Sequence, residues 1–310
     1  MDYSILLQQL LVLFAIMLVG YLSYKFKIID DKGYIQISSL VVLILNPFLM
    51  ISGVAGKRIA FSPEIINQNI ILVATLYASL FILGFIYVYL IGSKDNNSYL
   101  YRMLILLPNV GFMGIPLVKE MFGSEYIVFV TFYILGFNLI AYTYGIYLSS
   151  KFGNKEYKPK LFEKINFGTI SAFLSIIIFA YNIILPSPLI SFVNYMGEAC
   201  IVLSMIVVGA FLAKANLKEI LLNKSNLLFV FVFMLFVPLL MVLLTKKIPY
   251  DSHILGVFHI MLCMPVGSAT CMFAQEYGGD GTKAAHLVAA TTLATVLTAP
   301  TVFYLASLII

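Results

Sequence analysis

The chain alternates between long apolar runs and short clusters of polar and helix-breaking residues. Dividing it at the clusters of Lys, Asp, Gly and Pro leaves ten runs, each 19 to 28 residues long. A bilayer core of roughly 30 Å is crossed by about 20 apolar residues in a helix, because each residue adds about 1.5 Å. The pattern therefore predicts an all-α polytopic membrane protein of about ten transmembrane helices. The runs are 5–24, 34–52, 65–92, 99–122, 124–149, 166–185, 190–213, 226–244, 252–277 and 283–308.

Composition supports lipid as the surroundings of these helices. Apolar and aromatic residues make up 62% of the chain and charged residues only 11%, which is too little polar surface for a soluble domain of this length. Lys25 and Lys27 follow the first run instead of preceding it, the reverse of a signal peptide, so we interpret that run as the first span. The three cysteines lie in apolar runs without metal-ligand spacing, so we expect neither a metal nor a cofactor.

The basic residues predict an orientation. With ten spans the connections alternate between the two sides, and fourteen of the nineteen lysines and arginines fall on one side. Because basic loops stay in the cytoplasm, the sequence predicts a multi-pass cell-membrane protein with both termini outside. The cytoplasmic connection at 150–165 separates five runs in 1–149 from five runs in 166–310. An odd number of spans per half inverts the second half relative to the first, as in a 5+5 inverted repeat.

Two of the ten runs contain helix breakers near their middle. The fourth has Pro108, Gly111, Gly114 and Pro116, and the ninth has Pro265 followed by a glycine. Such residues free backbone groups that lipid cannot satisfy, so these segments must be buried or line water. Interrupted helices at corresponding positions of two repeats indicate a substrate site at the membrane midplane. A plain proline kink is the structural alternative.

The break in the fourth run is suited to an anion. An unwound helix exposes amide groups and the positive end of a half-helix, and Asn109 adds a neutral side-chain donor. Asn46 precedes Pro47 in the second run, where a break would widen a cavity or simply kink the helix. The candidate substrate-binding residues are Asn46, Pro108, Asn109, Gly111, Met113, Gly114, Ile115, Pro116, Pro265, Gly267, Ser268 and Thr270.

The same residues carry a family resemblance. Leu-Pro-Asn at 107–109 and Met-Gly-Ile-Pro-Leu at 113–117, followed by Lys119, resemble the fourth-span signature of the plant PIN-type auxin exporters. Phe273-Ala274 and Glu276-Tyr277 resemble the end of that family's ninth span. The chain is thus similar over its whole length to the auxin efflux carrier family. The resemblance implies broken helices 4 and 9 that cross at the midplane, alternating access, and an organic carboxylate held by Asn109.

The chain also departs from the plant pattern. It has Ala269-Thr270-Cys271 where the plant carriers have a second proline, its central connection is short, and its third run lacks an acidic and basic pair. These differences make auxin itself a poor candidate. Family members outside plants are associated with malate- or malonate-type acids as well. We therefore expect a carrier of small carboxylates in contact with membrane lipid, with a homodimer left open and no nucleic-acid partner.

Other polar residues inside the runs leave several roles open. Glu198 lies well inside the seventh run, where an unpaired charge is costly, and His259 in the ninth is its expected partner. A role of both in proton coupling stands beside a purely structural one. Asn138 in the fifth run is expected to hydrogen-bond either the crossing point or a neighbouring helix.

Three other classes of protein are alternatives to a carrier. A cation or proton antiporter of similar architecture would need a midplane carboxylate, yet Asp and Glu are missing from both breaks. A channel differs in kinetics that a sequence does not reveal. An enzyme is not expected, because the aspartates fall in predicted loops or termini and HExxH, GxSxG and P-loop motifs are missing.

Overall fold

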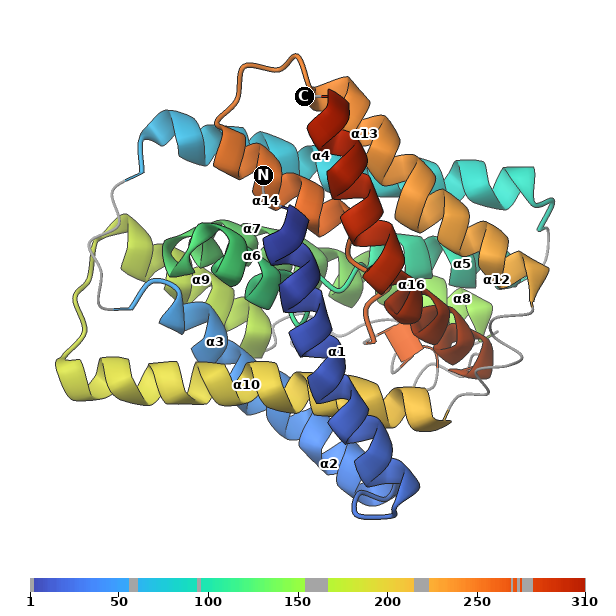
Figure 1. Cartoon of the computed structure of the whole chain (residues 1–310), viewed down its shortest axis with the longest axis horizontal. Coiled ribbons are helices and arrows are strands. Elements are labelled where there is room, and N and C mark those ends of the chain that lie inside the picture. Colours follow the sequence, from blue (N-terminus) through green and yellow to red (C-terminus); the bar gives the residue numbers. More distant parts are fainter. Residues whose placement is uncertain are drawn as a thin grey trace.

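The computed structural model describes residues 3–55, 61–93, 96–153, 167–214, 223–268, 270–271, 274 and 281–309. Within these residues every regular element is a helix, and one isolated β-bridge joins Pro108 to Val266. The all-α fold class predicted from the apolar runs is therefore confirmed. Figure 1 shows the arrangement of the helices.

Each of the ten expected runs contains helix in the described residues. The first half holds α1 (Tyr3–Lys25), α2 (Asp31–Leu40), η1 (Val41–Leu45), α3 (Asn46–Ser52), α4 (Pro63–Leu90), α5 (Asn97–Leu106), α6 (Gly114–Phe122), η2 (Ser124–Tyr126), α7 (Ile127–Ile140), η3 (Ala141–Gly145) and α8 (Ile146–Phe152). The second half holds α9 (Phe167–Ala180), α10 (Ser187–Lys214), α12 (Lys224–Val230), η5 (Phe231–Phe236), α13 (Val237–Thr245), α14 (Ser252–Leu262) and α16 (Gly281–Ile309).

Several of these helices are long and apolar enough to cross a bilayer. Seven helical stretches of the described chain meet that requirement, and Ile170–Ala180 and Ser252–Leu262 are shorter apolar helices. Many large apolar side chains on α1, α4 and α10 are exposed, such as Leu18, Ile82 and Phe192. An exposed apolar surface of this extent suits contact with lipid. The chain is therefore a polytopic membrane protein, while the number of ten spans stays a prediction.

The second run is continuous, which corrects the expectation that Asn46 and Pro47 break it. Helix α2 passes through the π-helical segment η1 into α3, and the N–H of Asn46 bonds to the carbonyl of Val41, five residues earlier. A local π-turn shifts the hydrogen-bond pattern of the helix, so the helix continues although Pro47 has no N–H to donate. The second run is therefore helical without interruption from Asp31 to Ser52.

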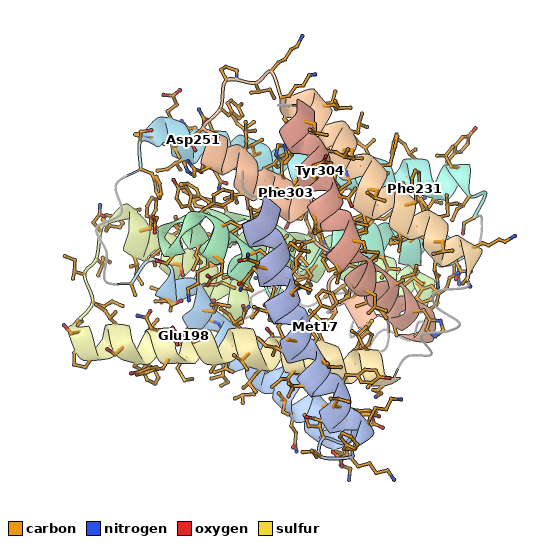
Figure 2. All side chains as sticks on the ribbon, viewed as in Figure 1. Met17, Glu198, Phe231, Asp251, Phe303 and Tyr304 are labelled. Atoms are coloured by element: carbon orange, nitrogen blue, oxygen red, sulfur yellow. The ribbon has the colours of Figure 1, made fainter. Side chains whose placement is uncertain are left out.

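Helices α1, α3 and α10 pack into one block through small residues. A Cβ on Gly20 would overlap the backbone of α10, and one on Gly209 would overlap the backbone carbonyl of Met17 in α1. Gly197 of α10 lies close to α3, where a Cβ would meet Ser52 Oγ at 2.9 Å. Small residues let membrane helices approach this closely. Figure 2 marks Met17 where α1 crosses α10. We call helices α1, α3 and α10 together the α10 block.

An ion pair fastens one end of this block to α2. Lys214 Nζ, in the last turn of α10, lies 2.6 Å from Asp31 Oδ1 at the start of α2. The hydroxyl of Tyr24 in α1 donates to the same oxygen at 2.9 Å. Figure 1 shows α10 and α4 on opposite sides of the molecule, with α6 and α7 between them.

Candidate functional site

The fourth and ninth runs are interrupted where their prolines predict. Helix α5 ends at Leu106 and α6 begins at Gly114, so residues 107–113 form a non-helical connection. Helix α14 ends at Leu262, and residues 263–268 also lack helix. Pro108 and Pro265 fall inside these breaks, where neither ring can donate a helical hydrogen bond.

The two breaks pair with each other. The N–H of Asn109 donates to the carbonyl of Pro265 at 2.7 Å, and the N–H of Gly267 donates to the carbonyl of Leu107 at 2.8 Å. Each break therefore satisfies backbone groups that the other has freed, as burial in a membrane protein requires. A Cβ on Gly267 would lie 3.0 Å from the Leu107 carbonyl oxygen, so this close approach favours glycine.

Neighbouring helices hold the crossing in place. Thr291 of α16 accepts a hydrogen bond from the N–H of Val266 at 3.2 Å. Thr270 donates to the carbonyl of Gly267 at 2.7 Å, so its hydroxyl is used within the break. A Cβ on Gly114, where α6 begins, would lie 2.8 Å from Met261 Cε of α14. Helix α6 therefore starts in tight contact with the partner segment.

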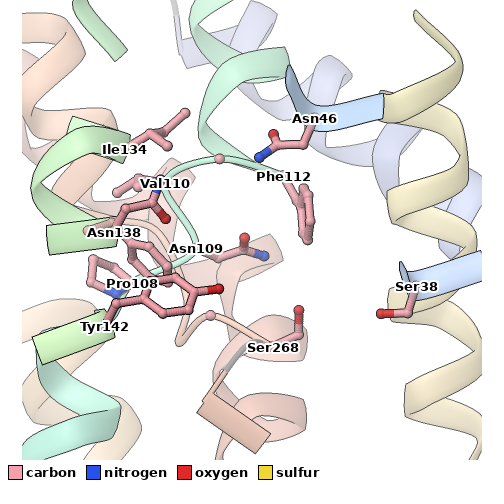
Figure 3. A pocket seen from close by; sticks show the side chains of 13 residues that line it. Ser38, Asn46, Pro108, Asn109, Val110, Phe112, Ile134, Asn138, Tyr142 and Ser268 are labelled. Atoms are coloured by element: carbon pink, nitrogen blue, oxygen red, sulfur yellow. The ribbon is translucent and has the colours of Figure 1, made fainter. Parts of the chain in front are cut away.

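A cavity lies beside the crossing, and we call it the crossover cavity. It holds about 700 Å³ of empty space, including the part that is open to the outside. Figure 3 shows the polar ends of Ser38, Asn46, Asn109 and Ser268 around one common space. The lining residues are Ser38, Asn46, Pro108, Asn109, Val110, Gly111, Phe112, Ile134, Phe137, Asn138, Tyr142, Gly267 and Ser268.

The predicted site residues divide into those that line this cavity and those that support it. Asn46, Pro108, Asn109, Gly111, Gly267 and Ser268 line it. The side chains of Met113, Ile115 and Pro116 are buried in the core instead. Pro265, Gly114 and Thr270 belong to the contacts that hold the crossing together.

Sequence reasoning missed much of the cavity's other side. Ser38, Phe112, Ile134, Phe137 and Tyr142 were not singled out, although all line the cavity. Asn138, for which two roles are left open, lines it too and is the one amide side chain in the mostly apolar helix α7. That contrast within α7 was the one available signal.

The polar groups of the crossover cavity are neutral and partly unsatisfied. None of its thirteen lining residues carries a charge. Asn109 is only 7% exposed, and Asn46 Oδ1 and Asn138 Nδ2 are buried without a hydrogen-bond partner in the described structure. A buried polar atom without a partner costs about 1–3 kcal/mol, so water or a polar ligand at this edge of the cavity would be stabilising. The N-terminus of α6, with its partial positive charge, begins two residues after Phe112.

Comparison with known proteins places the chain among transporters. The model of a family described as membrane transport proteins matches residues 5–166 and 163–304. The chain belongs to this family. The family includes the auxin efflux carriers, which confirms the resemblance of the fourth and ninth runs. An uncharacterised transporter from Methanocaldococcus jannaschii shares 30% identity with this transporter over 221 residues, which cover 67% of the chain and 69% of the relative.

The expected pairing of Glu198 with His259 is wrong for this transporter. His259 is buried, and its Nε2 lies 3.0 Å from Thr245 Oγ1 of α13. Glu198 is exposed on α10 (Figure 2). It lines a different cavity, together with Lys119. Depth along a span placed both residues alike, but their helices turn them toward different neighbours. Phe273, Glu276 and Tyr277 lie outside the described side chains.

Proposed function

We propose that this transporter is a carrier of small organic carboxylates, which it binds in the crossover cavity and moves by alternating access. The observation that carries the proposal is a set of neutral amide and hydroxyl groups around the paired breaks, with no charged side chain among the described residues of the lining. Asn109 is central to it, because it lies in one break and its backbone is bonded to the other.

Neutral donors suit a carboxylate that must be both bound and released. A hydrogen bond to a charged group contributes about 1.5–3 kcal/mol, and several such bonds give useful affinity without a permanent cation that would trap the anion. The partial positive charge at the N-terminus of α6 also favours an anion. Phe112, Ile134 and Phe137 supply apolar surface for the hydrocarbon part of the acid.

The position of the cavity between two groups of helices supports alternating access. One side is formed by Ser38 and Asn46, on the helix that continues into α3, and the other by the paired breaks and α7. The α10 block is close-packed through glycines, so it is a suitable static body. Movement of the paired breaks against this block would expose the site to each side in turn, as the predicted inverted repeat implies.

Ligand binding to purified protein tests the proposal. Only a ligand that prefers the folded state raises the melting temperature, so a panel of mono- and dicarboxylates identifies the class. Malonate and malate are expected to raise the melting temperature, whereas sodium chloride at equal ionic strength is not. Stabilisation by a cation alone would favour an antiporter, and flux in proteoliposomes without saturation or counterflow would favour a channel. Either result would refute the carboxylate carrier.

A further inference from the structure

A second cavity lies along the same helices and contains opposite charges. It holds about 590 Å³ of empty space between α3, α6 and α10, and we call it the Lys119 cavity. Lys119 comes from the last turn of α6, and Glu198 and Asn194 come from α10. Ser52 of α3 and Ser124 add hydroxyl groups. Among the described residues, the two cavities have no lining residue in common.

The two cavities nevertheless follow one seam between the α10 block and the crossing. Helix α3 contributes Asn46 to the crossover cavity and Ser52 to the Lys119 cavity. Helix α6 begins at the crossing and carries Lys119 five residues later, which is roughly 7.5 Å along its axis. Helix α3 and the segment that runs from the crossing through α6 therefore contribute residues to both cavities.

Lys119 and Glu198 both line the Lys119 cavity without forming an ion pair with each other. Neither is in an ion pair with another described residue. Lys119 is half-buried, whereas Glu198 is exposed. An ammonium in a recess whose other walls include Leu49 and Ile127 attracts an anion more strongly than one in open water, because fewer waters screen it. Glu198, on the facing helix, competes with such an anion for the same ammonium.

We infer that the Lys119 cavity is a second carboxylate-binding station at the other end of the seam. Lys119 attracts the carboxylate, and Glu198 weakens its hold so that the acid is not trapped there. The crossover cavity thus binds by neutral donors and the Lys119 cavity by charge. This inference rests on the proposed function, and under the predicted orientation the Lys119 cavity opens to the outside.

Two variants, each with one added cysteine, report on the two cavities separately. Asn194→Cys places a thiol in the Lys119 cavity and Ser38→Cys places one in the crossover cavity, while native Cys200, Cys263 and Cys271 are buried. The rate of modification by a methanethiosulfonate reagent is measured against malonate concentration. Malonate is expected to slow modification in both proteins. In the Asn109→Ala background the half-protecting concentration should rise about tenfold for the Ser38→Cys protein and stay unchanged for the Asn194→Cys protein.

Charge variants then test the role of Lys119. Lys119→Met should raise the half-protecting malonate concentration at least tenfold, and for the Asn194→Cys protein only. Lys119→Arg, which keeps the positive charge, should leave this concentration near that of the parent Asn194→Cys protein. Glu198→Gln should lower it. The ratio of modification rates for an anionic and a cationic reagent should fall with Lys119→Met and rise with Glu198→Gln. Lys247→Met, which removes an exposed lysine beyond α13, is the matched control and should change neither quantity.

The outcomes separate the two proposals. Protection of the Ser38→Cys protein without protection of the Asn194→Cys protein would overturn the second station and leave the crossover site standing. An unchanged reagent ratio in Lys119→Met would mean that this lysine serves only the C-terminus of α6, and would also overturn the inference. Failure of malonate to protect either protein would overturn the carboxylate function and the second station together.

Discussion

Replacing Asn109 by alanine removes a polar side chain from the crossover cavity while leaving the crossing itself intact. The bond from Asn109 to the carbonyl of Pro265 is made by the backbone N–H, which alanine retains. The residue is only 7% exposed, so its carboxamide is shielded from bulk water. Little of the hydrogen bond between a ligand and this group is therefore offset by lost hydration. The substitution should therefore affect the ligand more than the fold.

The expected loss follows from a single hydrogen bond to a charged acceptor. Such a bond contributes about 1.5–3 kcal/mol, and each 1.4 kcal/mol is a factor of ten, so Asn109→Ala should weaken carboxylate binding by about 10- to 150-fold. Asn109→Asp should be worse, because its carboxylate repels the ligand. Asn46→Ala should cost less than tenfold, since Asn46 belongs to the helix on the opposite side of the cavity and lies off the paired breaks.

Titration calorimetry on purified variants measures these affinities, and counterflow in proteoliposomes measures the corresponding transport. The melting temperature of each unliganded variant serves as the control for folding. If Asn109→Ala melts like the parent protein and binds the acid with unchanged affinity, the assignment of Asn109 is refuted. The binding role would then pass to Ser268, Asn138 or the backbone of the break.

The remaining predictions concern packing, orientation and coupling. Gly209→Leu should lower the melting temperature strongly, because overpacking costs about 1–3 kcal/mol or more and the backbone of α1 cannot yield, whereas Val202→Leu on the exposed face of α10 should have little effect. A membrane-impermeant thiol reagent on intact cells should label a cysteine at residue 2 but not Lys155→Cys, which lies outside the described residues, and the opposite pattern would reverse the topology. If Glu198 couples transport to protons, Glu198→Gln flattens the pH profile of uptake with little change in binding; an unchanged profile limits Glu198 to the Lys119 cavity.

Local rules explain what the sequence could predict. Apolar runs identify helices to within a few residues, as when the run at 65–92 becomes the helix Pro63–Leu90. Proline removes a donor wherever it stands, so the breaks at Pro108 and Pro265 were visible before their pairing was. The same rule was wrong at Pro47, because a π-turn in the preceding residues compensates for the missing N–H. Whether such compensation occurs depends on neighbours that a run of residue types does not specify.

Contacts between distant segments explain what it could not. Ser38 and Tyr142 line one cavity, although more than a hundred residues separate them. Their direction around each helix is set by packing. The same uncertainty misdirected Glu198 toward His259, when the helix crossing turns it toward Lys119. Sequence spacing indicates how deep a residue lies in the membrane but not which way its side chain points around the helix axis. It therefore identified the breaks and left the partners of each side chain undetermined.

Helices α3 and α6 connect the two cavities mechanically as well as spatially. Both cavities are bounded on one side by α3, which Gly53 and Gly197 hold against Ile127 and α10 without room for a Cβ. Helix α6 carries Lys119 of the second cavity and directly follows the break that lines the first, and its first residue, Gly114, is in tight contact with Met261 of α14. A shift of α6 that opens the seam at Lys119 must therefore carry the paired breaks with it. The neutral cavity and the charged one would then change their access together, because one rigid nine-residue helix joins them.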